Sequence, residues 1–225
     1  MNTLAIKSTL GFLNLLLMMG LAIFLPAKTI YFEQAWWYLA IFFGGVIVIT
    51  VYIFINDKSL LKSRLKVGSV AEQRMAQKVI QGFASVGFMA MYIVSGYDHR
   101  YSWTVLPDWV WIFSDGMLVV IMGLLFVIFR KNTYLSATIE VQEHQQVISD
   151  GPYALVRHPM YSVALLLFVF TPLSLGSFWA LLSLPLMILV LMLRCLDEEI
   201  ALKKQLAGYE DYCKKVRYHI VPWVW

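Results

Sequence analysis

Side chains that could do chemistry gather in two polar segments of an otherwise apolar chain. The first runs from Tyr134 to Tyr161 with the sequence YLSATIEVQEHQQVISDGPYALVRHPMY, and the second runs from Arg194 to Tyr212 with the sequence RCLDEEIALKKQLAGYEDY. Neither segment contains a glycine-rich loop for phosphates or dinucleotides, nor the serine motif of a hydrolase. Their arginine, histidine, glutamate and tyrosine side chains are suited to binding charged groups and to proton transfer.

Local patterns predict how these side chains are presented. Pro159 suits the first turn of a helix, so Arg157–His158 lies where the first polar segment enters an apolar stretch. In the second segment, Arg194 and Glu198 lie one helical turn apart on one face, while Glu199 is rotated by about 100°. If the apolar stretch between the segments folds back as a hairpin, both return to one membrane surface and build a single polar site.

Composition excludes a soluble globular domain. The chain has 225 residues, of which 60% are hydrophobic and 14% are charged, and its mean hydropathy is +0.70. A soluble domain contains about 25% charged residues, so the sequence indicates an integral membrane protein rather than a soluble domain, a disordered tail or a disulfide scaffold. The two cysteines, Cys195 and Cys213, are expected to be free thiols on a reducing side of the membrane.

Apolar runs predict an all-α integral membrane protein with about six transmembrane helices. Four runs have about 20 residues each, the length of one helical span. They cover Ser8–Ala27, Trp36–Ile55, Val79–Tyr97 and Trp109–Phe129. A further apolar stretch, 159–193, has 35 residues and contains Pro172, Gly176 and Pro185 as breaks. We therefore expect its two helices to form a hairpin, with a tight turn near Leu173–Ser177.

Two of the expected helices carry unusual residues. The third contains Gly82, Gly87 and Gly96, and small residues favour close packing between membrane helices, so we expect an interior position. The fourth contains Asp115, and a carboxylate within a span is costly. Because Asp115 lies about two turns from Trp109 at the start of that helix, both a functional and a structural role stay open.

Basic residues predict the orientation. If six helices cross the membrane, the N-terminal residues, the loop 56–78, the segment 130–158 and the C-terminal tail share one side and contain 16 of the 18 Lys and Arg residues. The positive-inside rule then places both termini and the polar site in the cytoplasm. The loop 56–78 is either a helix on anionic headgroups or a solvated loop. The net charge of +4 comes largely from these flanks, so no nucleic-acid partner is expected.

Each candidate side chain also has an ordinary structural interpretation. Arg157 could be an anchor whose charged end reaches the membrane surface, and His158 could be a capping or loop residue. The pair Glu198–Glu199 could be a solvated helix face. The other histidines, His99 and His219, are not spaced from acidic or cysteine residues as metal ligands are, so no metal site is expected.

Taken together, the two segments resemble a known family. The string His144-x-x-Val147-x-x-x-Gly151-x-Tyr153-x-x-x-Arg157-His158-Pro159-x-Tyr161 resembles the cofactor-binding core of the isoprenylcysteine carboxyl methyltransferases and of related membrane phospholipid methyltransferases. The string Arg194-x-x-x-Glu198-Glu199-x-x-Leu202, with Gly208, Tyr212 and Ile220-Val221-Pro222 after it, is similar to the same family. The resemblance covers about residues 130–225. It departs at Val163, where the family usually has glycine and where Ala164 is the nearest small residue.

The resemblance implies transfer of a methyl group from S-adenosylmethionine, bound in a cytoplasmic pocket, to an acceptor that arrives from the lipid. It implies cofactor contacts from Gln142, His144, Val147, Tyr153, His158, Pro159, Tyr161 and Glu199. Arg157 would orient an anionic acceptor, and Glu198 would position the cofactor or receive a proton, although the roles of the two glutamates could be exchanged. Tyrosine faces would favour the sulfonium cation.

This interpretation divides the chain at about residue 100. Residues 1–100 would hold N-terminal transmembrane helices and the basic cytoplasmic loop 56–78. Residues 101–225 would form a methyltransferase core with a fourth helix, the cofactor segment 130–158, the hairpin 159–193 and a C-terminal cytoplasmic helix. The acceptor would be a lipophilic small molecule, a lipid or a prenylated substrate, with a carboxylate favoured. No obligate protein partner is inferred.

Three other functions remain as alternatives. An amino-phospholipid N-methyltransferase would use the same cofactor, but its acceptor must lose a proton. An NADPH-dependent sterol-reductase-like enzyme has a distantly similar C-terminal half, but such proteins usually have more membrane helices than this chain can fit. A membrane scaffold or small transporter is disfavoured, because the charged residues cluster at one face and none clearly lines a path across the midplane.

Overall fold

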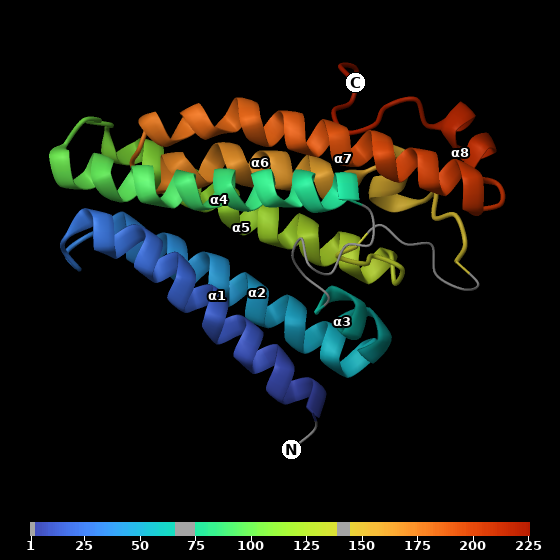
Figure 1. Cartoon of the computed structure of the whole chain (residues 1–225), viewed down its shortest axis with the longest axis horizontal. Helices are drawn as coiled ribbons and strands as arrows, with labels where there is room; N and C mark the ends of the chain where they lie inside the picture. Colours follow the sequence, from blue (N-terminus) through green and yellow to red (C-terminus); the bar gives the residue numbers. More distant parts are fainter. Residues whose placement is uncertain (1–2, 66–74, 139–144) are drawn as a thin grey trace.

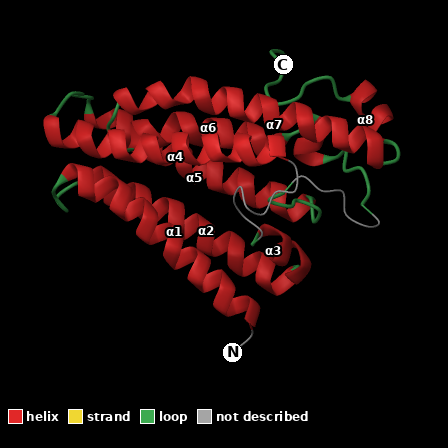
Figure 2. Ribbon diagram, viewed as in Figure 1, coloured by secondary structure: helices red, strands yellow, loops and turns green. Residues whose placement is uncertain are grey.

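The computed structural model describes residues 3–65, 75–138 and 145–225, which form a bundle of elongated helices (Figure 1). Within these ranges every regular element is helical and no strand occurs (Figure 2). The α-helices are α1 (Thr3–Ala27), α2 (Glu33–Asn56), α3 (Lys58–Arg64), α4 (Met75–Tyr101), α5 (Asp108–Lys131), α6 (Pro159–Ser174), α7 (Leu184–Gln205) and α8 (Tyr209–Lys215). Two short 3-10 helices, η1 (Gly151–Ala154) and η2 (Trp179–Ser183), precede α6 and α7. The predicted all-α fold is confirmed.

Among the described residues, five helical segments are long and apolar enough to cross a membrane. They are α1, α2, α4, α5 and the continuous segment Trp179–Gln205, which joins η2 to α7. The chain is therefore an integral membrane protein. The remaining apolar helix, α6, has 16 residues and is about 24 Å long at 1.5 Å per residue, less than the roughly 30 Å of a hydrocarbon core. The expected six helices are thus five of full length and a shorter one.

Helix α6 is short because both of its ends are fixed by neighbouring structure. The helix begins at Pro159, because the backbone of Arg157–His158 is hydrogen-bonded to the C-terminal tail instead of to a helix. It ends just before Gly176, whose φ of +67° lies in the left-handed region that favours glycine. Pro172 falls in the last turn of α6, and Pro185 falls in the first turn of α7, where proline is tolerated. The predicted hairpin is confirmed, but Pro185 begins a helix rather than breaking one.

The bundle collects the polar segments at one end. Helix α5 packs on α6 and α2, α1 packs on α4, and α4 packs on α7. In Figure 1 the α1–α2, α4–α5 and α6–α7 connections lie at one end of the bundle. The N-terminus, α3, the start of α6, α8 and the C-terminal tail lie toward the other end. The two polar segments, 134–161 and 194–212, therefore share one end, as a returning hairpin requires.

Two of the three glycines in α4 permit close helix packing. A Cβ on Gly96 would lie 2.4 Å from the backbone oxygen of Ile23 in α1. A Cβ on Gly87 would lie 2.5 Å from Sδ of Met187 in α7. A Cβ on Gly82 would have no neighbour within 4 Å. The predicted interior position of this helix is supported at Gly87 and Gly96, while Gly82 has no such role.

Buried carboxylates in the membrane-spanning helices are hydrogen-bonded to side chains outside their own helices. Asp115 in α5 accepts a hydrogen bond from the hydroxyl of Ser174 at the end of α6. Asp98 in α4 accepts hydrogen bonds from Oγ1 of Thr104 at 2.7 Å and from Oγ of Ser177 at 2.5 Å. These contacts hold helix ends and connecting loops together at the end of the bundle opposite to the polar segments. They favour a structural role for Asp115, because buried polar groups are stabilised when they are hydrogen-bonded.

Candidate functional site

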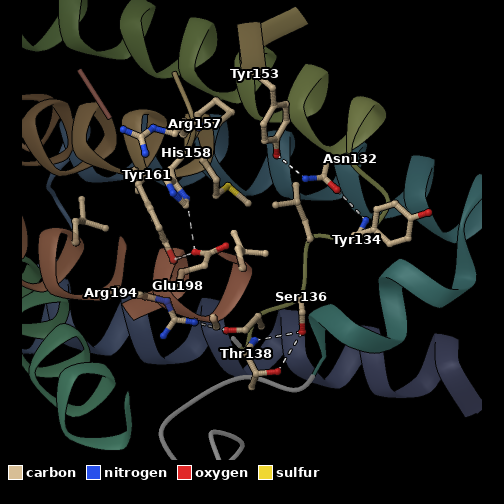
Figure 3. A pocket seen from close by; sticks show the side chains of 18 of the residues that line it. Asn132, Tyr134, Ser136, Thr138, Tyr153, Arg157, His158, Tyr161, Arg194 and Glu198 are labelled. Atoms are coloured by element: carbon tan, nitrogen blue, oxygen red, sulfur yellow. Dashed lines mark hydrogen bonds and ion pairs between the residues drawn. The ribbon is translucent and has the colours of Figure 1, made fainter. Parts of the chain in front are cut away.

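A cavity of about 400 Å³ lies at the polar end of the bundle (Figure 3). Its walls come from the segment between α5 and α6, from α6, from α7 along most of its length and from α8, with further side chains from α3 and α4. The polar lining includes Tyr153, Arg157, His158, Tyr161, Arg194, Glu198, Tyr209 and Tyr212. The two polar segments of the sequence therefore share one concave site.

The C-terminal tail holds the backbone before α6. The amide N–H of Arg157 donates to the carbonyl oxygen of Tyr218 at 2.8 Å, and the N–H of His158 donates to that of His219 at 2.9 Å. The residue before a proline avoids helical backbone geometry, so these two residues are free to pair with an extended segment. The tail thereby fixes where the side chains of Arg157 and His158 emerge.

The guanidinium of Arg157 connects α6, α7 and the tail. Its Nη1 atom lies 2.8 Å from Oε1 of Glu199, and its Nη2 atom donates to the carbonyl oxygen of Arg217 at 2.8 Å. The side chains of Arg157 and Glu199 are only 8% and 4% exposed. The Nε atom of Arg157 has no hydrogen-bond partner among the described residues. This buried pair holds the two polar segments together.

The carboxylate of Glu199 is surrounded by basic side chains. Besides Arg157, its carboxylate lies 3.4 Å from Nε2 of His158, 3.2 Å from Nζ of Lys203 and 3.5 Å from Nε2 of His219. The residue is 3% exposed, so the interpretation of Glu199 as part of a solvated helix face is wrong. Burial among these partners instead makes it a support for the histidine and arginine beside the cavity.

Glu198 lines the cavity, whereas Glu199 does not. Its Oε2 atom accepts a hydrogen bond of 2.5 Å from the hydroxyl of Tyr161 and lies 3.8 Å from Nδ1 of His158. Its side chain is 29% exposed. Figure 3 shows Tyr161, His158 and Glu198 converging on the cavity. The rotation of about 100° between successive helix positions explains why the adjacent glutamates have different surroundings.

Arg194 joins the other part of the site to α4. Its Nη1 atom donates to Oε1 of Gln81 at 3.0 Å and to Oε1 of Gln77 at 3.3 Å. Its Nη2 atom donates to the carbonyl oxygen of Ala137 at 2.7 Å. Gln77 in turn donates from Nε2 to Asp197 at 2.6 Å. A helix from the N-terminal half of the chain therefore positions a cavity arginine.

Three tyrosines form an aromatic part of the lining. The hydroxyl of Tyr153 accepts a hydrogen bond of 2.7 Å from Asn132, and the hydroxyl of Tyr212 donates to the carbonyl oxygen of Tyr153 at 2.7 Å. The hydroxyl of Tyr209 lies 3.4 Å from Nε2 of His158. Burial raises the pKa of Tyr153, Tyr209 and Tyr212 above the ordinary phenol value. These side chains are therefore neutral near pH 7 and serve as hydrogen-bonding and aromatic surfaces.

The structure brings most of the sequence-predicted site residues together. Seven of the ten line the cavity, namely Val147, Tyr153, Arg157, His158, Pro159, Tyr161 and Glu198. Glu199 is not among the lining residues, but it contacts Arg157 and His158. Gln142 and His144 lie outside the described residues.

The position at which the resemblance departs from the family pattern lies outside the cavity. Val163, where the resemblance departs from its pattern, is buried in the bundle core and does not line the cavity. Ala164, the next residue, does line it. The valine at this position therefore does not narrow the cavity.

The two cysteines are free thiols, as expected. Cys195 is buried and Cys213 is half-buried.

Sequence reasoning missed the contribution of the N-terminal half. Arg64 at the end of α3, and Gln81 and Ala84 in α4, line the cavity. Asn132 and Tyr134, just after α5, were also missed. No spacing pattern connects the first three to the polar segments, and the basic composition of the loop 56–78 was the one available signal.

The remaining histidines, His99 and His219, are not among the residues that line the cavity. His219 pairs with Glu199, a contact that sequence spacing did not indicate, and burial lowers the pKa of His219. His99 lies in the last turn of α4 and stacks on Phe32, with ring centroids 3.8 Å apart. Across the described ranges, no group of three His, Cys, Asp or Glu side chains is arranged to hold a metal ion.

Comparison with known proteins bears on the second half of the chain. A model of the phospholipid methyltransferase family matches residues 110–207, from the first turn of α5 to just beyond α7. The matched segment contains Arg157, His158, Tyr161 and Glu198. No curated protein matches the chain. Residues 110–207 are therefore similar to the phospholipid methyltransferase family, one of a group of membrane methyltransferases that includes the isoprenylcysteine carboxyl methyltransferases.

Proposed function

We propose that this membrane methyltransferase transfers a methyl group from S-adenosylmethionine to a lipophilic acceptor delivered from the bilayer, and that the cavity holds both molecules. The observation that carries the proposal is the convergence of Tyr161, His158 and Glu198 on one cavity. These residues come from two separated segments of the matched domain. Such a concave site with a few polar groups is the usual form of a small-molecule site.

The cavity has the donor set that S-adenosylmethionine requires. Its volume of about 400 Å³ falls within the range of roughly 300–1,000 Å³ for small-molecule pockets. Glu198 can accept from an ammonium group or from ribose hydroxyls, and Arg194 can donate to a carboxylate. Tyr209 and Tyr212 offer aromatic faces near which a sulfonium is favoured, and Val147 offers apolar surface. When bound, the cofactor supplies an electrophilic methyl group on a sulfonium.

The two glutamates have separate roles in this proposal. Glu198 orients the reacting groups or receives a proton, with the Tyr161 hydroxyl holding its carboxylate in place. Glu199 acts as a positioning residue, because its contacts go to Arg157 and His158 instead of to the cavity. The bonds of Arg157 to Glu199 and to the tail leave it poorly placed to orient an acceptor, so we assign it a positioning role as well.

The membrane-side lining suits a lipid acceptor. Ala84 of α4, Phe168 of α6 and Met187, Val190 and Leu191 of α7 form this apolar part of the wall. They belong to helices of the bundle, and the polar groups lie beyond them at its end. An acyl or prenyl chain can be placed among the apolar side chains by burial of its own apolar surface, which leaves its reactive head near Glu198.

An amine is the acceptor that Glu198 favours. A protonated amine is attracted to this carboxylate and must lose a proton to become nucleophilic, so a cavity carboxylate serves both needs. An amino-phospholipid has such a group. The second candidate is a carboxylate acceptor of the isoprenylcysteine type. It is favoured by the two guanidinium groups, Arg64 and Arg194, that also line the cavity, and it needs alignment but no base.

The orientation proposed from the charge distribution fits the same arrangement. Of the 18 basic residues, 16 belong to the N-terminal, 56–78, 130–158 and C-terminal segments of the sequence, and the described parts of these segments lie toward the end of the bundle that carries the cavity. We propose that this end, with both termini, faces the cytoplasm. Reporter fusions at the two termini test this, and reporters on opposite sides of the membrane would contradict it.

Binding and turnover measurements test the function directly. Titration calorimetry of the detergent-purified protein with S-adenosylhomocysteine and with NADPH should give binding of the first alone. Labelled S-adenosylmethionine should then transfer its methyl group to phosphatidylethanolamine or to S-farnesylcysteine, and the labelled product identifies the acceptor class. Binding of NADPH alone would support a reductase, and binding of neither ligand would support a scaffold. Glu198→Gln should abolish the labelling, which ties it to this cavity.

A further inference from the structure

Arg64 reaches the cavity from outside the methyltransferase domain. It is the last residue of α3, 46 positions before the matched segment begins at residue 110. Its Nη1 atom donates to the carbonyl oxygen of Ser136 at 3.2 Å, and its guanidinium lies over the ring of Phe129, 5.1 Å from the centroid. Arg64 also lines the cavity.

Arg64 lies next to a second guanidinium. Arg194 donates to the carbonyl oxygen of Ala137, the residue that follows the carbonyl partner of Arg64 in the chain. Burial, together with the positive charge of Arg194, lowers the pKa of Arg64 to about 10. The pKa remains well above 7, so the side chain is positively charged at neutral pH.

Among the described residues, the surroundings of Arg64 provide a hydrogen-bond acceptor and an aromatic face but no opposite charge. Within the described ranges, Arg64 contacts a backbone carbonyl and an aromatic face, and no carboxylate lies in ion-pair contact with it. A guanidinium has five N–H donors arranged to hold a carboxylate or phosphate. A partly buried cation that lacks a counter-charge is stabilised by an anion brought with a ligand.

We propose that Arg64 binds the anionic group, phosphate or carboxylate, of the lipid acceptor, so that the N-terminal half of the chain takes part in acceptor selection. This inference rests on the methyl-transfer function proposed above. The apolar lining holds the chain of the acceptor and Arg64 holds its anionic group. In an amino-phospholipid this leaves Glu198 for the amine, and in a carboxylate acceptor the group that Arg64 holds is the one that is methylated. Anionic and zwitterionic lipids present such groups at the membrane surface, where α3 lies beside the polar end of the bundle.

Lipid binding by the full chain in detergent tests the proposal without requiring turnover. Native mass spectrometry would compare the wild type, Arg64→Gln, Arg64→Lys and the control Lys62→Gln, which alters an exposed basic residue of the same helix. One arm pairs phosphatidylethanolamine with diacylglycerol, and the other pairs S-farnesylcysteine with its methyl ester. The first pair differs in the phosphoethanolamine headgroup, whose phosphate is the anionic group under test, and the second pair differs in one carboxylate. Both pairs keep the apolar chains.

Arg64→Gln should weaken binding of the anionic member of one pair at least about tenfold, because charge-assisted hydrogen bonds are the strong ones. Binding of the neutral member and of S-adenosylhomocysteine should stay within about twofold, which also shows that the variant folds. Arg64→Lys should fall between, since its charge remains without the planar fork. Loss in the first arm identifies phosphate, and loss in the second identifies carboxylate.

Three results would overturn the proposal. Equal losses for the anionic and neutral members would assign Arg64 a structural role, and no loss in either arm would remove it from the acceptor site. A matching loss of S-adenosylhomocysteine affinity would assign it to the cofactor carboxylate. If the wild type transfers no methyl group, the proposed function fails, but a selective loss of the anionic lipid in Arg64→Gln would still support Arg64 as the headgroup anchor.

Discussion

The Nη1 atom of Arg157 lies 2.8 Å from Oε1 of Glu199, although 42 positions separate the two residues in the chain. The pair joins the start of α6 to the last turns of α7. Through Nη2, Arg157 also holds the carbonyl oxygen of Arg217 in the tail. The polar site is therefore built on a buried ion pair that adjoins the cavity. Residues in contact with the cavity and residues that support it should respond differently to mutation.

Substitution of the adjacent glutamates should separate an effect on turnover, at Glu198, from an effect on stability, at Glu199. Glu199→Gln leaves Arg157 buried without its ion-pair partner, and removal of one partner of a buried pair typically costs about 3–5 kcal/mol. We expect a clear fall in the midpoint of thermal unfolding. Glu198→Gln should keep that midpoint, because Glu198 is 29% exposed, but should lower turnover by about 100-fold or more if it acts as a base. Similar thermal midpoints for both variants would contradict the division.

Arg157→Lys should loosen the C-terminal tail. An ammonium cannot reach the Glu199 carboxylate and the Arg217 carbonyl in the two directions that the guanidinium uses. We expect faster amide hydrogen exchange at Tyr218 and His219, measured by mass spectrometry of peptides from residues 216–225. Exchange in the α1 peptides serves as the internal control and should not change. Unaltered exchange in the tail, with lower turnover, would return Arg157 to the role of an acceptor-binding residue.

Local patterns in the sequence predict the helices and the second half of the site. Proline and glycine positions give the α6–α7 hairpin, and helical periodicity separates Glu198 from Glu199. The contacts of Gln77 and Gln81 with Arg194 could not be predicted, because they depend on how α4 packs against α7 over more than 100 positions. Each glutamine also has an ordinary place in an apolar helix, so its type carries no signal.

Other parts of the fold depend on details that periodicity does not contain. The shortness of α6 follows from hydrogen bonds between its preceding residues and the tail, which no local pattern in α6 records. Arg64 is one of six basic residues in the loop 56–78, and composition alone cannot select the one that reaches the cavity. Of three glycines in α4, packing against backbone distinguishes Gly96, and this depends on the path of α1.

Tyr161→Phe should reduce turnover without affecting the fold. The substitution removes the hydroxyl that donates to Glu198 at 2.5 Å and keeps the ring that packs near His158. Hydrogen bonds to charged groups contribute about 1.5–3 kcal/mol, so a fall in turnover of roughly tenfold or more is expected from steady-state methyl transfer. The matched control is Tyr97→Phe, which removes the hydroxyl of an exposed tyrosine in α4 outside the cavity lining. Equal turnover in both variants would remove Tyr161 from the catalytic site.

Asp115→Ala should lower stability and leave chemistry intact. The Asp115 carboxylate accepts from Ser174 and does not line the cavity. Its removal leaves a buried hydroxyl without that partner, at a cost of about 1–3 kcal/mol. Thermal unfolding should record the loss, while turnover well below the unfolding temperature should stay within about twofold of wild type. Lost turnover at unchanged stability would instead support a functional carboxylate in α5.

Two alanine substitutions in α4 should have opposite effects on stability, although both replace a glycine in the same helix. In Gly96→Ala the new Cβ would lie 2.4 Å from the backbone oxygen of Ile23 and 3.2 Å from the backbone nitrogen of Ala27, so α1 must move away. Overpacking of this kind typically costs about 1–3 kcal/mol. In Gly82→Ala the new Cβ would have no neighbour within 4 Å, and alanine is favoured over glycine in a helix by up to about 1 kcal/mol. Thermal unfolding in one detergent should therefore rank Gly82→Ala at or above wild type and Gly96→Ala below it. Equal midpoints of thermal unfolding for the two variants would show that α1 and α4 do not pack closely at Gly96.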